Sequence, residues 1–160
     1  MSLIKTDAIQ TLAGKPILNS TGSVLQVVRT YVASSSVIET TSTSFTASGI
    51  TASITPKASG NLILIDCVMS MTDCVSDTIW VKMYQLIAGG SYAVMAGAAD
   101  YQMGIHSASR WIPNAFGGSY TTTSTSALTY QPYFKSSGGG NVRLVHDSSS
   151  YSLTLTEIAQ

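Results

Sequence analysis

Residues 50–69, ITASITPKASGNLILIDCVM, contain two strand patterns on either side of one turn. Residues 50–55 alternate apolar and hydroxyl side chains, which is the two-residue period of a strand with one buried face. Residues 59–61, Ser-Gly-Asn, then supply the chemistry of a turn. Residues 62–65 are apolar at every position, as expected of a central strand that is covered on both faces. Together these patterns predict a sheet with the second strand in its interior.

Most of the remaining chain repeats this plan of short β-branched or aromatic runs separated by glycine turns. Further strands are predicted at residues 24–32, 79–87, 92–95, 120–125, 128–134, 141–145 and around Leu153 and Leu155. Turns are predicted at Ser48-Gly49, Gly89-Gly90-Ser91, Gly117-Gly118-Ser119 and Gly138-Gly139-Gly140-Asn141. About nine short strands at close spacing indicate an all-β fold, an antiparallel β-sandwich that is jelly-roll-like.

Two of these strands carry apolar side chains on both faces. Either another subunit or a loop of the same chain covers the outer face of residues 62–65. The strand at residues 79–84 carries the same pattern, because Trp80 and Tyr84 share one face while the aliphatic side chains between them share the other.

The predicted surface is neutral and rich in hydroxyl groups. Of 160 residues, 44 are serine or threonine, and eight acidic residues balance eight basic ones. Such a chain has no electrostatic attraction for nucleic acid or anionic lipid, so neither partner is predicted. The longest apolar run, residues 62–69, contains Asp66 and is too short to span a bilayer. Polar residues near the start also disfavour a signal peptide.

Residues 1–23 do not follow the strand pattern and are predicted to form a docking arm ahead of a β-sandwich domain at residues 24–160. Apolar residues near the start are spaced for one side of a short helix, and an extended arm fits as well. An apolar stripe this short needs a surface to dock on. The residues expected at that assembly interface are Leu3, Ile4, Ile9, Leu12, Ile17 and Leu18.

The chain carries little that resembles reaction chemistry. His106 and His146 lie in polar surroundings without a nucleophile motif. The densest group of metal-ligand residue types lacks zinc or EF-hand spacing, and its two acids Asp73 and Asp77 are better explained as turn residues that cap their own backbone. That group is Asp66, Cys67, Asp73, Cys74 and Asp77. Residues 138–140, three glycines, lack the lysine and helix of a phosphate-binding loop. We therefore expect no catalytic residues, no cofactor and no metal; a Cys67–Cys74 disulfide is a minor alternative.

Exposed aromatic side chains are the remaining candidates for recognition. Tyrosine and tryptophan favour recognition surfaces, although many of those in this chain fall on strand positions that core packing explains equally well. Tyr101, Trp111 and Tyr120 lie near predicted loops and are the best candidates for an exposed contact.

Three segments resemble a known family. They are KTDAIQTLAGKPILNSTGSVLQVV at residues 5–28, TSTSFTASGITASITPKASGNLILI at residues 41–65 and SLTLTEIAQ at residues 152–160. They are similar to the opening cassette, the paired strands and the closing strand of small structural proteins of tailed bacteriophages, especially those of marine and cyanobacterial hosts. No segment between residues 66 and 151 shares the resemblance, and none of the three is a catalytic motif.

The resemblance implies a virion protein, assembled in the host cytoplasm and displayed as a homo-oligomer, with a trimer favoured. Three hypotheses follow from it. The first is a capsid decoration or cement protein whose arm docks on the major capsid protein. The second is a tail-fibre or receptor-binding knob, joined to a tail adaptor, that contacts a host surface glycan through residues 101–120. The third is a glycan hydrolase, which would need paired acids in a cleft and is disfavoured.

Overall fold

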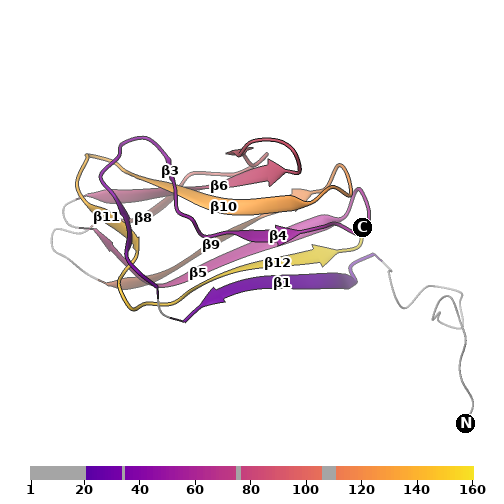
Figure 1. Cartoon of the computed structure of the whole chain (residues 1–160), viewed down its shortest axis with the longest axis horizontal. Coiled ribbons are helices and arrows are strands. Elements are labelled where there is room, and N and C mark those ends of the chain that lie inside the picture. The colour runs from indigo at the N-terminus through magenta and orange to yellow at the C-terminus, as the bar shows by residue number, and fades with distance from the viewer. Residues whose placement is uncertain (1–20, 34, 75–76, 106–110) are drawn as a thin grey trace, which may run out of the picture.

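The computed structural model describes residues 21–33, 35–74, 77–105 and 111–160, which form an antiparallel β-sandwich (Figure 1). The first sheet contains β1 (Val24–Val32), β12 (Tyr151–Ile158), β5 (Leu62–Cys74), β11 (Val142–Val145) and β2 (Ile38–Thr40) in that order, and β9 (Ile112–Thr121) also pairs with β5. The second sheet contains β3 (Thr46–Ala47), β10 (Leu128–Ser136), β6 (Thr78–Ile87) and β7 (Ala93–Val94), with β4 (Ala52–Ile54) on β10 and β8 (Tyr101–Ile105) on β6. The predicted all-β sandwich is confirmed.

Strand β5 organises the first sheet. Its first eight residues pair with β12 on one side and β9 on the other, and its last two pair with β11. Ile63, Ile65, Cys67 and Met69 point into the core and are fully buried. The strand predicted at residues 62–69 therefore exists but continues to Cys74, and it occupies the predicted interior position.

The core lies between the two sheets and is built from alternate residues of each long strand. Ile65 and Leu155 contribute from the first sheet, and Val81 and Phe134 contribute from the second. Each such side chain stabilises the fold by about 1.5–3 kcal/mol relative to an exposed position.

The outer face of β6 is covered by the chain itself. Trp80 and Tyr84 share this face and are half-buried, as the alternation predicted. The ring of Tyr84 stacks on Tyr133 of β10 at 3.9 Å. Phe45 and Tyr92, which lie outside the strands, pack on this pair at 6.4 and 6.0 Å. For this strand, loops of the same chain are the cover.

The turn predicted at Gly117-Gly118-Ser119 is wrong, because these residues lie in the middle of β9. A side chain at Gly117 would place its Cβ only 2.3 Å from the backbone oxygen of Ile65 on β5. Here glycine permits a close approach of two strands, which is its other common use in a sheet. The predicted strand at 120–125 is accordingly displaced to Ile112–Thr121, and the short strands β2, β3 and β8 were not predicted.

The N-terminal part of the sandwich closes against the end of β12. Gly22 donates a backbone hydrogen bond to Ala159 at 2.7 Å, and Ala159 donates one to Ser23 at 2.9 Å. Residues 1–20 of the arm predicted at residues 1–23, as a helix or an extended segment, lie outside the described residues. Within the part that is described, no helix is long and apolar enough to cross a membrane.

Candidate recognition surface at the Trp111 end

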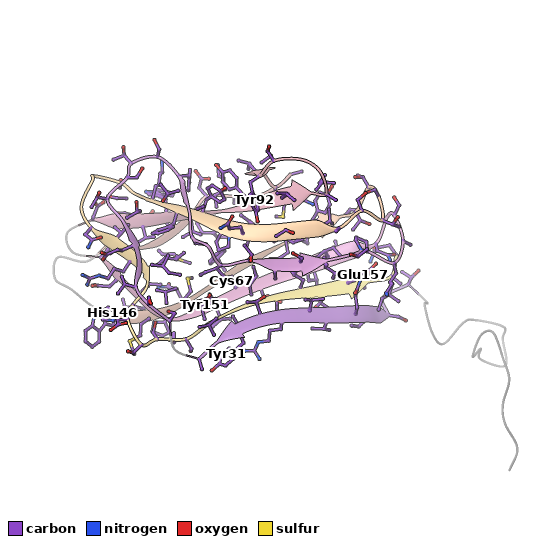
Figure 2. The ribbon with its side chains drawn as sticks, viewed as in Figure 1. Tyr31, Cys67, Tyr92, His146, Tyr151 and Glu157 are labelled. Atoms are coloured by element: carbon purple, nitrogen blue, oxygen red, sulfur yellow. The ribbon has the colours of Figure 1, made fainter. Side chains whose placement is uncertain are left out.

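One end of the sandwich brings aromatic and charged side chains together, of which Trp111 and Glu39 are exposed and Asp73 is buried. We call it the Trp111 end, and it comprises Glu39, Asp73, Trp111, Arg143 and His146. Trp111 is 61% exposed, directly before β9, and its ring lies 4.7 Å from that of His146, directly after β11. Figures 1 and 2 place β11 and His146 at this end, opposite Glu157.

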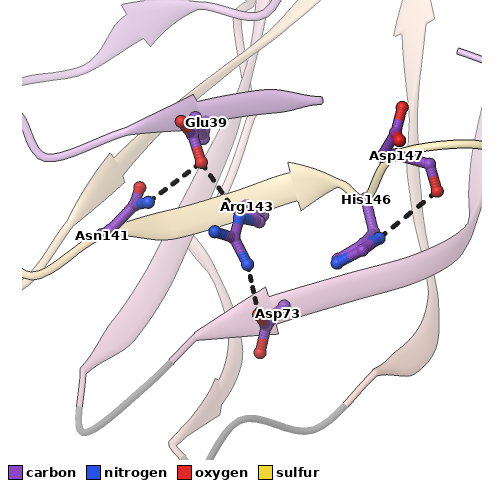
Figure 3. A network of polar contacts seen from close by, with 6 residues as sticks. All are labelled: Glu39, Asp73, Asn141, Arg143, His146 and Asp147. Carbon is purple, nitrogen blue, oxygen red and sulfur yellow. Dashed lines mark hydrogen bonds and ion pairs between the residues drawn. The ribbon is translucent and has the colours of Figure 1, made fainter. Parts of the chain in front are cut away.

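An ionic network crosses three strands beside this aromatic pair (Figure 3). Arg143 on β11 donates from Nε to Glu39 of β2 at 3.0 Å and from Nη1 to Asp73 of β5 at 3.1 Å. Asn141 also donates to Glu39, at 2.9 Å. The register brings these side chains together because Arg143 lies opposite both Glu39 and Asp73.

The network favours the charged forms of Glu39 and Arg143. Hydrogen bonds from Asn141 and then from Arg143 lower the pKa of Glu39, and the hydrogen bond to Glu39 is the main cause that raises the pKa of Arg143. The predicted turn role of Asp73 is wrong, because this residue lies within β5 and pairs with Arg143. The arrangement is an ion-paired surface beside an exposed indole ring, which suits stacking and hydrogen bonding to a ligand.

The glycine loop at the same end, residues 138–140, binds the carboxylate of Asp77 from the same chain. The carboxylate of Asp77 accepts backbone hydrogen bonds from Gly138 at 2.9 Å, Gly140 at 2.7 Å and Ser137 at 3.1 Å. The hydroxyl of Ser136 and the backbone N–H of Thr78 complete the set, at 2.5 and 2.6 Å. The predicted backbone-capping role of Asp77 is confirmed, with the cap extended to a second loop.

Among the described residues, neither His146 nor Cys67 forms a nucleophile–base pair. His146 contacts the backbone oxygen of Asp147 through Nδ1 at 3.3 Å, and the Ser149 hydroxyl donates to the backbone oxygen of His146 rather than to its ring. Burial raises the pKa of the Cys67 thiol to about 12, so it stays protonated. His106 lies outside the described residues.

The side chains of the group rich in metal-ligand residue types do not meet at one point. No disulfide joins Cys67 and Cys74, which lie on the same strand roughly 20 Å apart, too far for such a bond. Asp66 points away from the core, whereas Cys67 points into it. No group of three or more histidine, cysteine or acidic side chains suited to a metal occurs among residues whose placement is described.

The three aromatic residues predicted for recognition do not form one surface. The Tyr101 hydroxyl donates to the backbone oxygen of Gly117, and its ring packs 5.5 Å from Phe116. Tyr120 is half-buried near the far end of β9, about 30 Å along the strand from Trp111. Of the three, Trp111 is the exposed one. The predicted arm residues Leu3, Ile4, Ile9, Leu12, Ile17 and Leu18 all lie outside the described residues.

No family model matches the chain, and no curated protein is significantly similar to it. Among solved structures, the chain is similar to the structure of the Gx strain of infectious bursal disease virus, at 15% identity and a TM-score of 0.47, over 96% of this chain and 36% of that one. It is also similar to the enzymatically active domain of bacteriophage CBA120 tailspike protein 4, at 10% identity and a TM-score of 0.34, over 84% of this chain and 19% of that one. At these scores, and over so small a share of either structure, the similarity assigns no function.

Proposed function

We propose that this chain is a non-enzymatic structural protein of a tailed-phage virion, displayed on the particle surface as a capsid decoration or cement protein. In this role the arm, residues 1–23, attaches to the major capsid protein and the sandwich faces solvent. The resemblance of residues 5–28, 41–65 and 152–160 to small phage structural proteins suggests the setting.

The observation that carries the proposal is that the buried carboxylates of Asp77 and Glu157 accept hydrogen bonds from other parts of the same chain. Asp77 holds the glycine loop, and the buried carboxylate of Glu157 binds Gln26, Asn61 and the backbone of Lys57. These groups stabilise the chain's own loops. A neutral surface rich in serine and threonine also limits repulsion between many neighbouring copies.

Deletion of residues 1–20 is expected to abolish incorporation into particles while leaving a soluble sandwich. The deletion stops before Gly22 and Ser23, so their hydrogen bonds to Ala159 are retained. Incorporation is measured by protein content of purified particles, and position by antibody labelling in electron micrographs. Trp111→Ala is the control, because it leaves the arm intact and should be incorporated normally. Label found on tails alone, or a deletion variant incorporated at the normal level, would contradict the proposal.

The exposed Trp111 ring supports a second candidate function, a receptor-binding knob that contacts host surface polysaccharide. In that case the isolated protein binds the polysaccharide, and Trp111→Ala weakens binding by about tenfold or more, as expected for an exposed aromatic anchor. Trp111→Phe retains a ring and should retain most of the affinity. Titration calorimetry with purified host polysaccharide measures both. Equal binding by wild type and Trp111→Ala rules out this surface.

A further inference from the structure

The outer face of the first sheet exposes apolar side chains on β1 and β5, with serine and threonine side chains of β12 between them. We call it the β1-β12-β5 face, and its members are Val27, Arg29, Tyr31, Leu64, Asp66, Val68, Ser152, Thr154 and Thr156. Val27 is 58% exposed, Tyr31 57% and Val68 47%. Figure 2 shows Tyr31 projecting from β1 away from the interior.

The outward side chains of the two sheets differ in how far the chain itself covers them. On the second sheet, Phe45 and Tyr92 pack over the outward aromatic residues Tyr84 and Tyr133. On the first sheet, Val27, Tyr31 and Val68 remain about half exposed or more. Exposed apolar side chains grouped on one face of a sheet are a feature of interaction surfaces.

This face carries one positive and one negative charge in the same row, so two copies of the face can pair opposite charges. Arg29 of β1, Thr154 of β12 and Asp66 of β5 form one row across the sheet, so the two charges lie two strands, or about 10 Å, apart. The guanidinium of Arg29 lies 5.0 Å from the centre of the Tyr31 ring. In the described part of the chain, neither Arg29 nor Asp66 forms an ion pair.

We propose that the β1-β12-β5 face binds the same face of a second copy of this chain, about a twofold axis parallel to β12. This inference goes beyond the proposed function and does not depend on it. Such an axis places β1 of one copy over β5 of the other. Each row of paired residues across the sheet then faces the same row of the second copy. Arg29 then meets Asp66 of the second copy and Asp66 meets its Arg29, while Val27 meets Leu64 and Tyr31 meets Val68.

The charges select this axis over the alternatives. A twofold axis across the strands would place Arg29 on Arg29 and Asp66 on Asp66, and an axis along β5 would also place Asp66 on itself. Like charges in contact cost several kcal/mol. A threefold ring joins two different patches, whereas a patch complementary to itself is the property of a twofold interface. The face therefore favours a dimer over the trimer expected from the sequence.

The size of the face predicts a weak dimer. The nine side chains span five residues along each of three strands and cover roughly 250 Å² per copy, about a third of the ~800 Å² per partner in stable interfaces. The dissociation constant should therefore lie in the micromolar range in solution. Copies held side by side on a larger assembly would pair more readily, because their effective concentration is higher.

The test is a charge exchange in the full-length chain. Arg29→Asp and Asp66→Arg each place like charges at both symmetric contacts, so each should raise the dissociation constant by more than about tenfold. The double variant restores opposite charges and should recover the wild-type value within about threefold. Sedimentation velocity over a concentration series measures all four proteins. Wild type that stays monomeric at high micromolar concentration, or a double variant no better than the singles, overturns the proposal.

Val68→Asp and Val94→Asp form a matched control pair, because both valines are 47% exposed and they lie on opposite sheets. Only the first should weaken the dimer. A Val68→Cys variant tests whether the chain's own residues 1–20 cover the face instead. Cys67 and Cys74 are buried, so a maleimide should report the new thiol. Rapid labelling of the monomer is expected, and slow labelling would overturn the proposal.

Discussion

Replacement of Glu157 by alanine is expected to lower the free energy of unfolding by about 4 kcal/mol, since it leaves one buried donor and two partly buried donors without an acceptor. Glu157 is fully buried, and no basic side chain pairs with it among the described residues. Its carboxylate instead accepts hydrogen bonds from Gln26 at 2.5 Å, Asn61 at 2.6 Å and the backbone of Lys57 at 2.7 Å. One anion thus joins β1, the turn before β5 and β12.

Urea unfolding at neutral pH measures this loss through the transition midpoint. Glu39→Ala is the matched control, since Glu39 also accepts two side-chain hydrogen bonds but is exposed, and its stability change should be small. Glu157→Gln keeps the size of the side chain and should fall between wild type and alanine. A Glu157→Ala protein as stable as Glu39→Ala would show that the buried carboxylate does not organise this end of the sandwich.

Asp77→Ala is expected to cost about 3 kcal/mol, the second largest effect. The substitution frees five donors that the carboxylate satisfies, four of them backbone N–H groups. It also opens the space below the glycine loop, where the Asp77 carboxylate now lies so close that a Cβ at Gly140 would be 2.8 Å from Oδ2. Hydrogen exchange at residues 137–140 should rise more than in the rest of the sheet. Unchanged exchange there would contradict the assigned role of Asp77.

The same carboxylate predicts an acid sensitivity. Burial opposes ionisation of Asp77, but hydrogen bonds from Ser136, Thr78, Gly138 and Gly140 outweigh it and lower the pKa from 3.8 to about 2. A group with a lower pKa in the folded state stabilises the fold above its unfolded pKa, and that contribution disappears as the pH falls through the folded pKa. Wild-type stability should therefore decline between about pH 4 and pH 2, and Asp77→Asn should show a shallower decline over that interval.

The sequence predicted the elements that depend on local pattern. Strand β1 was predicted at its observed bounds, and β6 to within one residue, because alternation and β-branching are local signals. Gly117 misled the prediction, since a glycine that permits close strand contact looks the same in sequence as a glycine in a turn. The three-residue strand β2 carries too short a pattern to be recognised.

The polar centres could not be predicted because their partners are far apart in the chain. Glu157 and Asn61 are 96 residues apart, Arg143 and Glu39 are 104 apart, and Asp77 and Gly140 are 63 apart. Only the register of the finished sheets brings them together. Trp111 is the exposed one of the three aromatic residues predicted for recognition because it directly precedes β9. The sequence could not distinguish it from Tyr101 and Tyr120, because β9 was not predicted at those bounds.

The position of β12 between β1 and β5 has a consequence for biosynthesis. While the ribosome is still adding residues before Tyr151, β1 has no neighbour in its sheet and β5 lacks one of its two flanking partners. Native pairing of β1, and of β5 on its β12 side, must therefore wait until residues 151–158 have emerged, and until then these strands present unpaired edges that can aggregate. Completion of this sheet is expected to be slow, as in other β-proteins dominated by contacts between distant residues.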